Sequence, residues 1–182
     1  DAMFYGTSNG GLTVTGGEAV VQTEFLVELL KRCKEAGIHT SIETCSACSW
    51  DKIRQTLPYI DEYLCDVKHT DPVKLRAETG GDAQMLLDNI RKLAENGAKI
   101  LARVPMIPGF NTDEAEVESI GRFIASCKIP RVEILNFHRL GVPKYIKCFA
   151  GRLPKEREPL TQQELDRRLE ILRSLGLEAS VG

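Results

Sequence analysis

Amphipathic helical patterns and short β-prone runs alternate along the whole of this 182-residue chain, and this alternation most narrows the folds open to it. Gly37, Gly97 and Gly176 stand just after three of the helical segments, where helices commonly end. Strict β/α alternation predicts a parallel sheet with helices packed outside it. Strands are expected at residues 13–15, 39–43, 62–66, 99–104, 132–135 and 177–180, and helices at 22–36, 51–57, 82–96, 113–126 and 162–175.

The composition is that of an ordinary globular domain, with 42% hydrophobic and 27% charged residues. A chain of this length buries one sizeable core, so a single domain over residues 1–182 is expected. The net charge of -2 argues against the clustered Lys and Arg residues that a nucleic-acid-binding surface needs. No apolar run approaches the roughly 18 to 20 residues of a membrane span, and the first residues show no signal-peptide pattern. We therefore expect a cytoplasmic protein with no nucleic-acid or membrane partner.

Polar and ionisable residues recur where the expected strands end. In parallel α/β folds these ends lie at one edge of the sheet, where ligands bind. Each residue alone has a plain structural reading: Arg103 suits a neighbouring carboxylate, and a single His138 is more often a structural histidine than a ligand contact. Their recurrence at five successive strand ends predicts one shared site. The residues are Gly16, Gly17, Glu18, Glu43, Thr44, Asp66, Lys68, His69, Arg103, Asn136 and His138.

The first of these strand ends carries the sequence T-V-T-G-G-E at residues 13–18. Paired glycines let the backbone come close to a ligand, because neither residue has a Cβ atom. Glu18 then faces whatever lies there, and a carboxylate beside bare backbone suits a ligand with a positively charged amine. A tight strand-to-helix turn with a solvated Glu has the same pattern, so the motif needs support from the other strand ends.

The six cysteines show no disulfide-scaffold spacing, and reduced thiols are expected. Cys45 and Cys48 form a C-x-x-C that suits half a zinc site or a redox pair. No second C-x-x-C or H-x-x-x-H supplies further ligands, so a metal there is disfavoured. Cys33, Cys65 and Cys127 are expected to be small buried hydrophobic residues.

The irregular stretch of the chain is 141–160, which contains Pro143, Pro154 and Pro159. It is expected to form a loop over the site or a partner-facing surface, and an ordinary solvated connection fits equally well.

Five motifs occur in a fixed order, namely G-G-L-T-V-T-G-G-E-A, G-I-H-T-S-I-E-T, C-D-V-K-H, A-R-V-P-M-I-P-G-F-N and I-L-N-F-H-R-L-G. In order and spacing they resemble motifs of the radical S-adenosylmethionine (SAM) enzymes that activate glycyl-radical enzymes. The resemblance covers nearly the whole chain. It implies an α/β fold, a partial (β/α) barrel of radical SAM type with parallel strands and outer helices.

The resemblance also implies which residues hold SAM. Gly16, Gly17 and Glu18 match the G-G-E motif, whose backbone and carboxylate hold the methionyl amine. Arg103 matches an arginine near the carboxylate and ribose of the cofactor, and His138 matches a histidine near its adenosine end.

Two further groups of residues match the family on neighbouring strands. Asp66, Val67 and Lys68 match an element that lines the same pocket. Glu43, Thr44 and Asp66 match residues that surround a monovalent cation in some members, with Glu43 in place of an aspartate. The resemblance therefore implies a possible monovalent cation beside the cofactor.

The chain departs from the family in its cysteines. The family holds a [4Fe-4S] cluster on three cysteines spaced C-x-x-x-C-x-x-C, and this sequence has no such triplet. Its first strand matches the second strand of the family. The resemblance thus implies that the first β/α unit is missing, that the cluster belongs to the intact protein only, and that this chain alone does not cleave SAM.

For the intact protein, the resemblance implies reductive cleavage of SAM to a 5′-deoxyadenosyl radical, which generates a glycyl radical on a partner such as pyruvate formate-lyase. A flavodoxin or ferredoxin-type protein would donate the electron. Two alternatives stay open. A cluster-free aldolase or isomerase barrel would need a phosphate loop that the last units lack. The other is a small-molecule binding or scaffold module that kept the fold and lost the chemistry, and a scaffold has no use for Glu18, Asp66, Lys68, Arg103 and His138 together.

Overall fold

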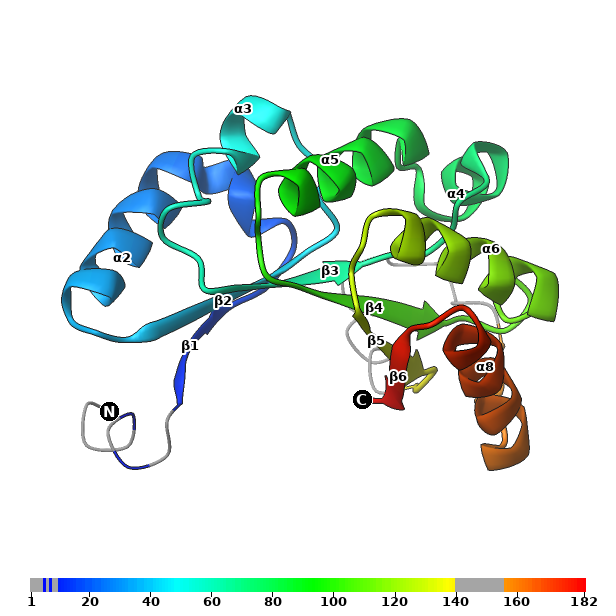
Figure 1. The fold of residues 1–182 in the computed structure, drawn as a ribbon. Helices are drawn as coiled ribbons and strands as arrows, with labels where there is room; N and C mark the ends of the chain where they lie inside the picture. Colours follow the sequence, from blue (N-terminus) through cyan, green and yellow to red (C-terminus); the bar gives the residue numbers. More distant parts are fainter. Residues whose placement is uncertain (1–4, 6, 8–9, 140–155) are drawn as a thin grey trace.

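The computed structural model describes residues 5, 7, 10–139 and 156–182, which form one six-stranded parallel sheet with helices (Figure 1). The strands are β1 (Gly11–Val14), β2 (His39–Thr44), β3 (Glu62–Asp66), β4 (Ile100–Met106), β5 (Arg131–Asn136) and β6 (Glu178–Val181). The helical elements are the 3-10 helix η1 (Ala19–Gln22) and the helices α2 (Thr23–Glu35), α3 (Trp50–Ile53), α4 (Pro72–Thr79), α5 (Ala83–Glu95), α6 (Glu114–Ser126) and α8 (Gln162–Ser174).

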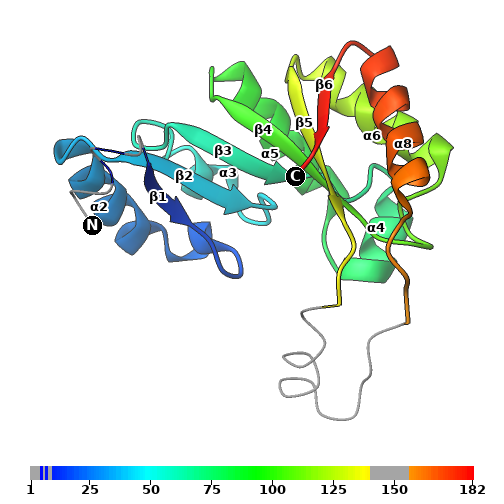
Figure 2. The same ribbon diagram turned by 90° about the horizontal axis from the view of Figure 1, so that it is seen from below.

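The strands lie side by side in their order along the chain, from β1 to β6. Parallel strands joined by crossovers of one hand place every connecting helix on the same face of the sheet. Figure 1 shows α2, α3, α5 and α6 together on one side of the sheet, and Figure 2 shows the opposite face without a helical layer in the described part. The predicted α/β architecture of parallel strands with outer helices is confirmed.

Strand β4 shows how the sequence builds the two faces. Ile100, Ala102, Val104 and Met106 are buried under the helices, and the residues between them are partly exposed. Since side chains alternate across a strand, Arg103 lies on the face that the helices leave open. β3 follows the same pattern, and the parallel register places Asp66 directly beside Arg103.

All six predicted strands and five predicted helices are present, with ends shifted by a few residues. Helix α4 was missed because Leu75 is its one buried residue, so it lacks an amphipathic pattern. Its start and end signals are nevertheless in the sequence. The Asp71 side chain accepts hydrogen bonds from the Val73 and Lys74 N–H groups, and Gly80 ends the helix with a φ of 72°.

The core lies between the sheet and the helices and contains the three predicted cysteines, Cys33, Cys65 and Cys127, all buried. Within the described residues, no helix is both long and apolar enough to cross a bilayer. The predicted loop at 141–160 falls largely on residues 140–155, outside the part of the chain that the structure describes.

Candidate functional site

The carboxyl-terminal parts of β1, β2, β3 and β4 bring together polar and charged side chains that we name the Arg103 cluster: Thr15, Glu43, Asp66, Lys68 and Arg103. The Arg103 Nη1 donates to Glu43 Oε1 at 2.7 Å, and its Nη2 donates to Asp66 Oδ1 at 3.2 Å. The Lys68 Nζ lies 3.2 Å from Asp66 Oδ2, and the Thr15 hydroxyl donates to Glu43 Oε2 at 2.6 Å. Four strand ends separated by up to 88 positions in the sequence therefore share one network of charges.

The Arg103 cluster shifts the protonation of its own members. The hydrogen bond from Thr15, followed by that from Arg103, holds the pKa of Glu43 below its ordinary value. Burial lowers the pKa of Arg103, but the interactions with Glu43 and Asp66 outweigh it, so the pKa is raised overall. Arg103 is 16% exposed, and it stays a fixed positive charge between two carboxylates.

Glu18 lies beside this cluster and is held by the turn that follows β2. Its carboxylate accepts from the Thr44 hydroxyl at 2.8 Å and from the backbone N–H groups of Cys45 and Ala47 at 3.2 and 3.4 Å. It also caps η1 by accepting from the Val20 N–H. The sequence predicted a carboxylate at this point, and the structure adds that it joins the turns after β1 and β2.

Gly16 and Gly17 form the turn between β1 and Glu18. Both adopt the left-handed backbone region, with φ of 94° and 58°, which residues with side chains rarely adopt. A Cβ atom built at either position meets no heavy atom within 4 Å. The two glycines thus leave open space beside the turn that leads to Glu18.

Not every predicted site residue reaches the Arg103 cluster. Thr44 points to the helix side and binds Glu18, because neighbours along a strand face opposite ways. Val67 is buried in the core, so only its backbone can face a ligand. His138 is exposed just after β5, and in the described part of the chain its side chain makes no hydrogen bond to the cluster.

Glu43, Thr44 and Asp66, which the resemblance placed around a monovalent cation, have protein partners here, with Thr44 bound to Glu18. The carboxylates of Glu43 and Asp66 both bind the Arg103 guanidinium, which supplies the positive charge between them. Among the residues that the structure describes, no group of three or more His, Cys, Asp or Glu side chains is arranged to hold a metal ion.

Thr15 and Asn111 belong to the neighbourhood of the site and were missed by the sequence reading. Thr15 follows β1 by one position and faces Glu43, a position that strand alternation allows one to infer. Asn111 bonds the Lys68 carbonyl oxygen from the loop after β4. No local sequence pattern marks that contact, since 43 positions separate the two residues.

Cys45 and Cys48 are both held as thiols. Burial and the Glu18 charge raise the pKa of Cys45, and the same two causes raise the pKa of Cys48 to about 11. The Cys45 Sγ donates to Glu18 Oε2 at 3.4 Å. A thiolate is the form that binds metals and attacks disulfides, so this environment opposes both uses near neutral pH.

Alkylation tests this protonation state. We expect the rate at which iodoacetamide modifies Cys48 to rise roughly tenfold per pH unit until the pH approaches its raised pKa, because only the thiolate reacts. Peptide-level mass spectrometry measures this rate, with free glutathione as the control thiol. A plateau at a pH below that of glutathione would contradict the raised pKa.

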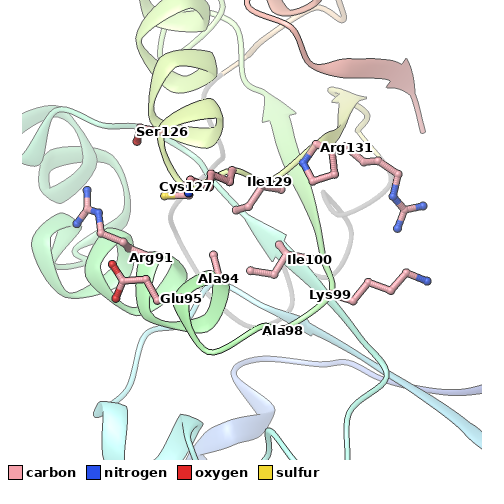
Figure 3. A pocket seen from close by; sticks show the side chains of 12 residues that line it. Arg91, Ala94, Glu95, Ala98, Lys99, Ile100, Ser126, Cys127, Ile129 and Arg131 are labelled. Atoms are coloured by element: carbon pink, nitrogen blue, oxygen red, sulfur yellow. The ribbon is translucent and has the colours of Figure 1, made fainter.

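A cavity lies at the opposite end of the sheet from the Arg103 cluster. It has a volume of about 600 Å³ and lies between the last turns of α5 and α6 and the first residues of β4 and β5 (Figure 3). Three cations of its lining have acidic partners: Arg91 pairs with Asp88, and Lys99 and Arg131 pair with Glu62. In α/β barrels this amino-terminal end of the strands serves stability, so we do not assign the site to this cavity.

A family model described as the Radical SAM superfamily matches residues 7–119. The chain is 36% identical over 174 residues to the isethionate sulfite-lyase activating enzyme of Nitratidesulfovibrio vulgaris, covering 94% of this chain and 56% of that protein. It is 33% identical over 186 residues to the choline trimethylamine-lyase activating enzyme of Oleidesulfovibrio alaskensis, covering 100% of this chain and 60% of that protein. The chain thus spans less than two thirds of the length of these curated relatives.

Among solved structures, the fold matches a domain of the pyruvate-formate lyase-activating enzyme from Bacteroides vulgatus with a TM-score of 0.78. The sequence identity is 26%, and the match covers 95% of this chain and 99% of that one. The likeness therefore extends over nearly the whole chain rather than over one motif.

Proposed function

This chain belongs to the radical SAM superfamily, and we propose that its strand-end site binds SAM within a protein that activates a glycyl-radical enzyme. The observation that carries the proposal is the joining of Glu18, the open turn at Gly16 and Gly17, and the Arg103 cluster at one edge of the sheet. Homologous proteins are glycyl-radical enzyme activating enzymes, which supports the proposed activity.

The described residues suit the methionyl part of SAM. This part carries an amine and a sulfonium, both positive, and one carboxylate. Glu18 beside the open glycine turn suits the amine, and Lys68 and Arg103 suit the carboxylate. Glu43 and Asp66 keep the Arg103 side chain in one orientation, so that the site is preorganised for this ligand.

The described residues do not supply ligands for a [4Fe-4S] cluster, which takes cysteine thiolates. We propose that the cluster is held by cysteines elsewhere in the whole protein. When both groups are bound, SAM and the reduced cluster supply the radical that removes a hydrogen atom from a glycine of the partner. This chain contributes by binding and orienting SAM, and no residue of the site acts as a conventional acid, base or nucleophile.

We propose a glycyl-radical enzyme as the protein partner and a flavodoxin or ferredoxin-type protein as the electron donor. The curated relatives are named for isethionate sulfite-lyase and choline trimethylamine-lyase, and the matched structure for pyruvate-formate lyase. Pyruvate formate-lyase is therefore one candidate among several glycyl-radical enzymes of related kind.

The activity is tested on the protein at the length of its curated relatives, reconstituted with iron and sulfide without oxygen. We expect release of 5′-deoxyadenosine from SAM under reductant, and a glycyl-radical signal by electron paramagnetic resonance when the true partner is added. A long protein that takes up no cluster and releases no 5′-deoxyadenosine would contradict the proposal and favour a cluster-free binding module.

Gly17→Ala tests the open turn against a matched control. An alanine in the left-handed region costs about 1 kcal/mol of stability, and Gly37 has a similar φ of 69° and equally open surroundings far from the site. We expect Gly17→Ala and Gly37→Ala to lower the melting temperature alike. Only Gly17→Ala is expected to weaken SAM binding, by roughly 10-fold, because its methyl group occupies the ligand's space. Equal SAM affinity in the two variants, measured by calorimetry, would contradict a close approach at Gly17.

A further inference from the structure

The loop that follows β3 is fastened to the segment between β4 and α6 and to α6 itself. The Lys68 carbonyl oxygen accepts from Asn111 Nδ2 at 2.8 Å. The Thr70 and Ser119 hydroxyls share a hydrogen bond, with 2.7 Å between their oxygen atoms. Between them, the His69 ring packs against Phe110 with 5.0 Å between ring centroids. Residues 68–70, shortly after Asp66, thus each contact a residue between 110 and 119, in the loop before α6 or in α6.

Asn111 is the centre of this attachment. It is 0% exposed, and its side-chain amide is fully used. Its Nδ2 donates to the carbonyl oxygens of Lys68 and Pro105, each at 2.8 Å, and its Oδ1 accepts from the Ile107 N–H at 2.7 Å. One buried side chain therefore joins the ends of β3 and β4, the strands that carry Asp66 and Arg103.

His69 strengthens the same junction from the next position. Its ring is 0% exposed, and its Nδ1 accepts from the Asp71 N–H at 2.9 Å. An Nδ1 that accepts leaves the proton on Nε2, which lies 3.0 Å from Glu116 Oε2 at an angle unfavourable for a hydrogen bond. Glu116 of α6 also pairs with Lys74 of α4, so that both helices pack around this loop.

Burial of an Asn and a His costs free energy unless their hydrogen bonds are made, and apolar residues pack more cheaply. Asn111 and the His69 Nδ1 make hydrogen bonds with the backbone of Lys68 and Asp71, next to the charged side chains of the site, and the His69 Nε2 faces Glu116 without one. We propose that Asn111 and His69 are positioning residues, which fix the Lys68 ammonium and the Asp66 carboxylate relative to Arg103 for binding of the SAM carboxylate. This proposal rests on the proposed function.

The test compares Asn111→Ala with Tyr63→Phe in the protein at the length of its relatives. Tyr63 is a matched control: it is buried at the start of β3, and its hydroxyl bonds the Thr56 hydroxyl at 2.8 Å away from the site. Each change removes buried hydrogen bonds and lowers the melting temperature. We expect Asn111→Ala alone to weaken SAM binding, measured by calorimetry without reductant, by at least about 10-fold. It should also speed amide hydrogen exchange at residues 68–71.

Two further variants keep the test informative if Asn111→Ala does not fold. Asn111→Asp keeps the acceptor for Ile107 and loses both donors, and His69→Gln keeps a donor toward Glu116 and loses the acceptor for Asp71. Both are expected to weaken SAM binding and to speed exchange at 68–71. Unchanged SAM affinity in these variants, or an equal loss in Tyr63→Phe, would overturn the positioning role. A wild-type protein that does not bind SAM would instead refute the proposed function. In that case, unchanged amide exchange at residues 68–71 in the variants would refute the role of Asn111 and His69 in holding this loop.

Discussion

Replacement of Arg103 by methionine is expected to lower the free energy of unfolding by about 3 kcal/mol and to abolish measurable SAM binding. In the wild-type protein the Glu43 and Asp66 carboxylates lie 2.7 and 3.2 Å from the guanidinium, and the change leaves Glu43 without a counter-ion and Asp66 with Lys68 as its remaining one. Truncation of a buried ion pair is costly because it leaves an uncompensated charge, and the partial exposure of these carboxylates places the cost at the lower end of that range. Urea denaturation and calorimetry measure the two effects.

Arg122→Met provides the control, because Arg122 and Glu118 form an exposed pair on one face of α6. We expect it to change stability by less than about 0.5 kcal/mol and SAM binding not at all. Adding Glu43→Gln to Arg103→Met should restore part of the lost stability by removing one unpaired charge. Equal stability of Arg103→Met and Arg122→Met would show that the Arg103 cluster does not hold the strand ends together.

The lowered pKa of Glu43 gives this network a pH dependence of known sign. A carboxyl group with a folded-state pKa below its ordinary value of 4.5 adds stability above that pH, and the contribution is lost as the pH falls through the folded-state pKa. Wild-type protein should therefore lose more stability than Glu43→Gln between neutral pH and acid. Parallel unfolding curves of the two proteins down to acid pH would contradict the ion pair.

Glu18 is expected to show the second large effect, with stability and affinity responding to different changes. Glu18→Ala removes the cap of η1 and the acceptor for the Thr44 hydroxyl and two turn N–H groups, at a cost of about 2 kcal/mol. Glu18→Gln keeps one acceptor oxygen and should cost less. Both lose the negative charge, so both should bind SAM roughly 30-fold more weakly, corresponding to about 2 kcal/mol for a charged hydrogen bond.

The exposed Glu28 of α2, which pairs with Arg32, supplies the matched control. Glu28→Gln is expected to leave both the urea midpoint and the SAM affinity unchanged. If Glu18→Gln bound SAM as tightly as wild type, Glu18 would be a structural link between two turns and no more.

Much of the fold follows from the sequence, because the apolar residues of each strand and of most helices recur with the spacing typical of that element. In strands β3 and β4, buried residues alternate with partly exposed ones, and the parallel pairing of the two strands then places Asp66 beside Arg103. The position of the site was predictable for the same reason, since parallel strands end at a common edge. Helix α4 could not be predicted in this way. It has one buried residue and therefore no amphipathic pattern, and only its capping residues mark it in the sequence.

The contacts within the site were less predictable than its position. Thr44 and Val67 match family motifs, but strand alternation turns the side chain of Thr44 toward Glu18 and that of Val67 into the core. The backbone N–H groups of Cys45 and Ala47 donate to Glu18, and the Asn111 side chain donates to the Lys68 carbonyl oxygen. These hydrogen bonds join residues at least 27 positions apart. Such contacts depend on the packed arrangement of several elements, which no local pattern records.

Amide hydrogen exchange with and without SAM tests the assignment of the site most directly. On the protein at the length of its relatives, SAM should slow exchange at residues 16–18, 43–45, 66–68 and 103–105, where the strand ends meet. Exchange at residues 94–100 and 126–131, around the cavity of Figure 3, should stay unchanged. Protection of the cavity residues, or no protection at the strand ends at SAM concentrations that saturate binding, would contradict the SAM site proposed for this fold.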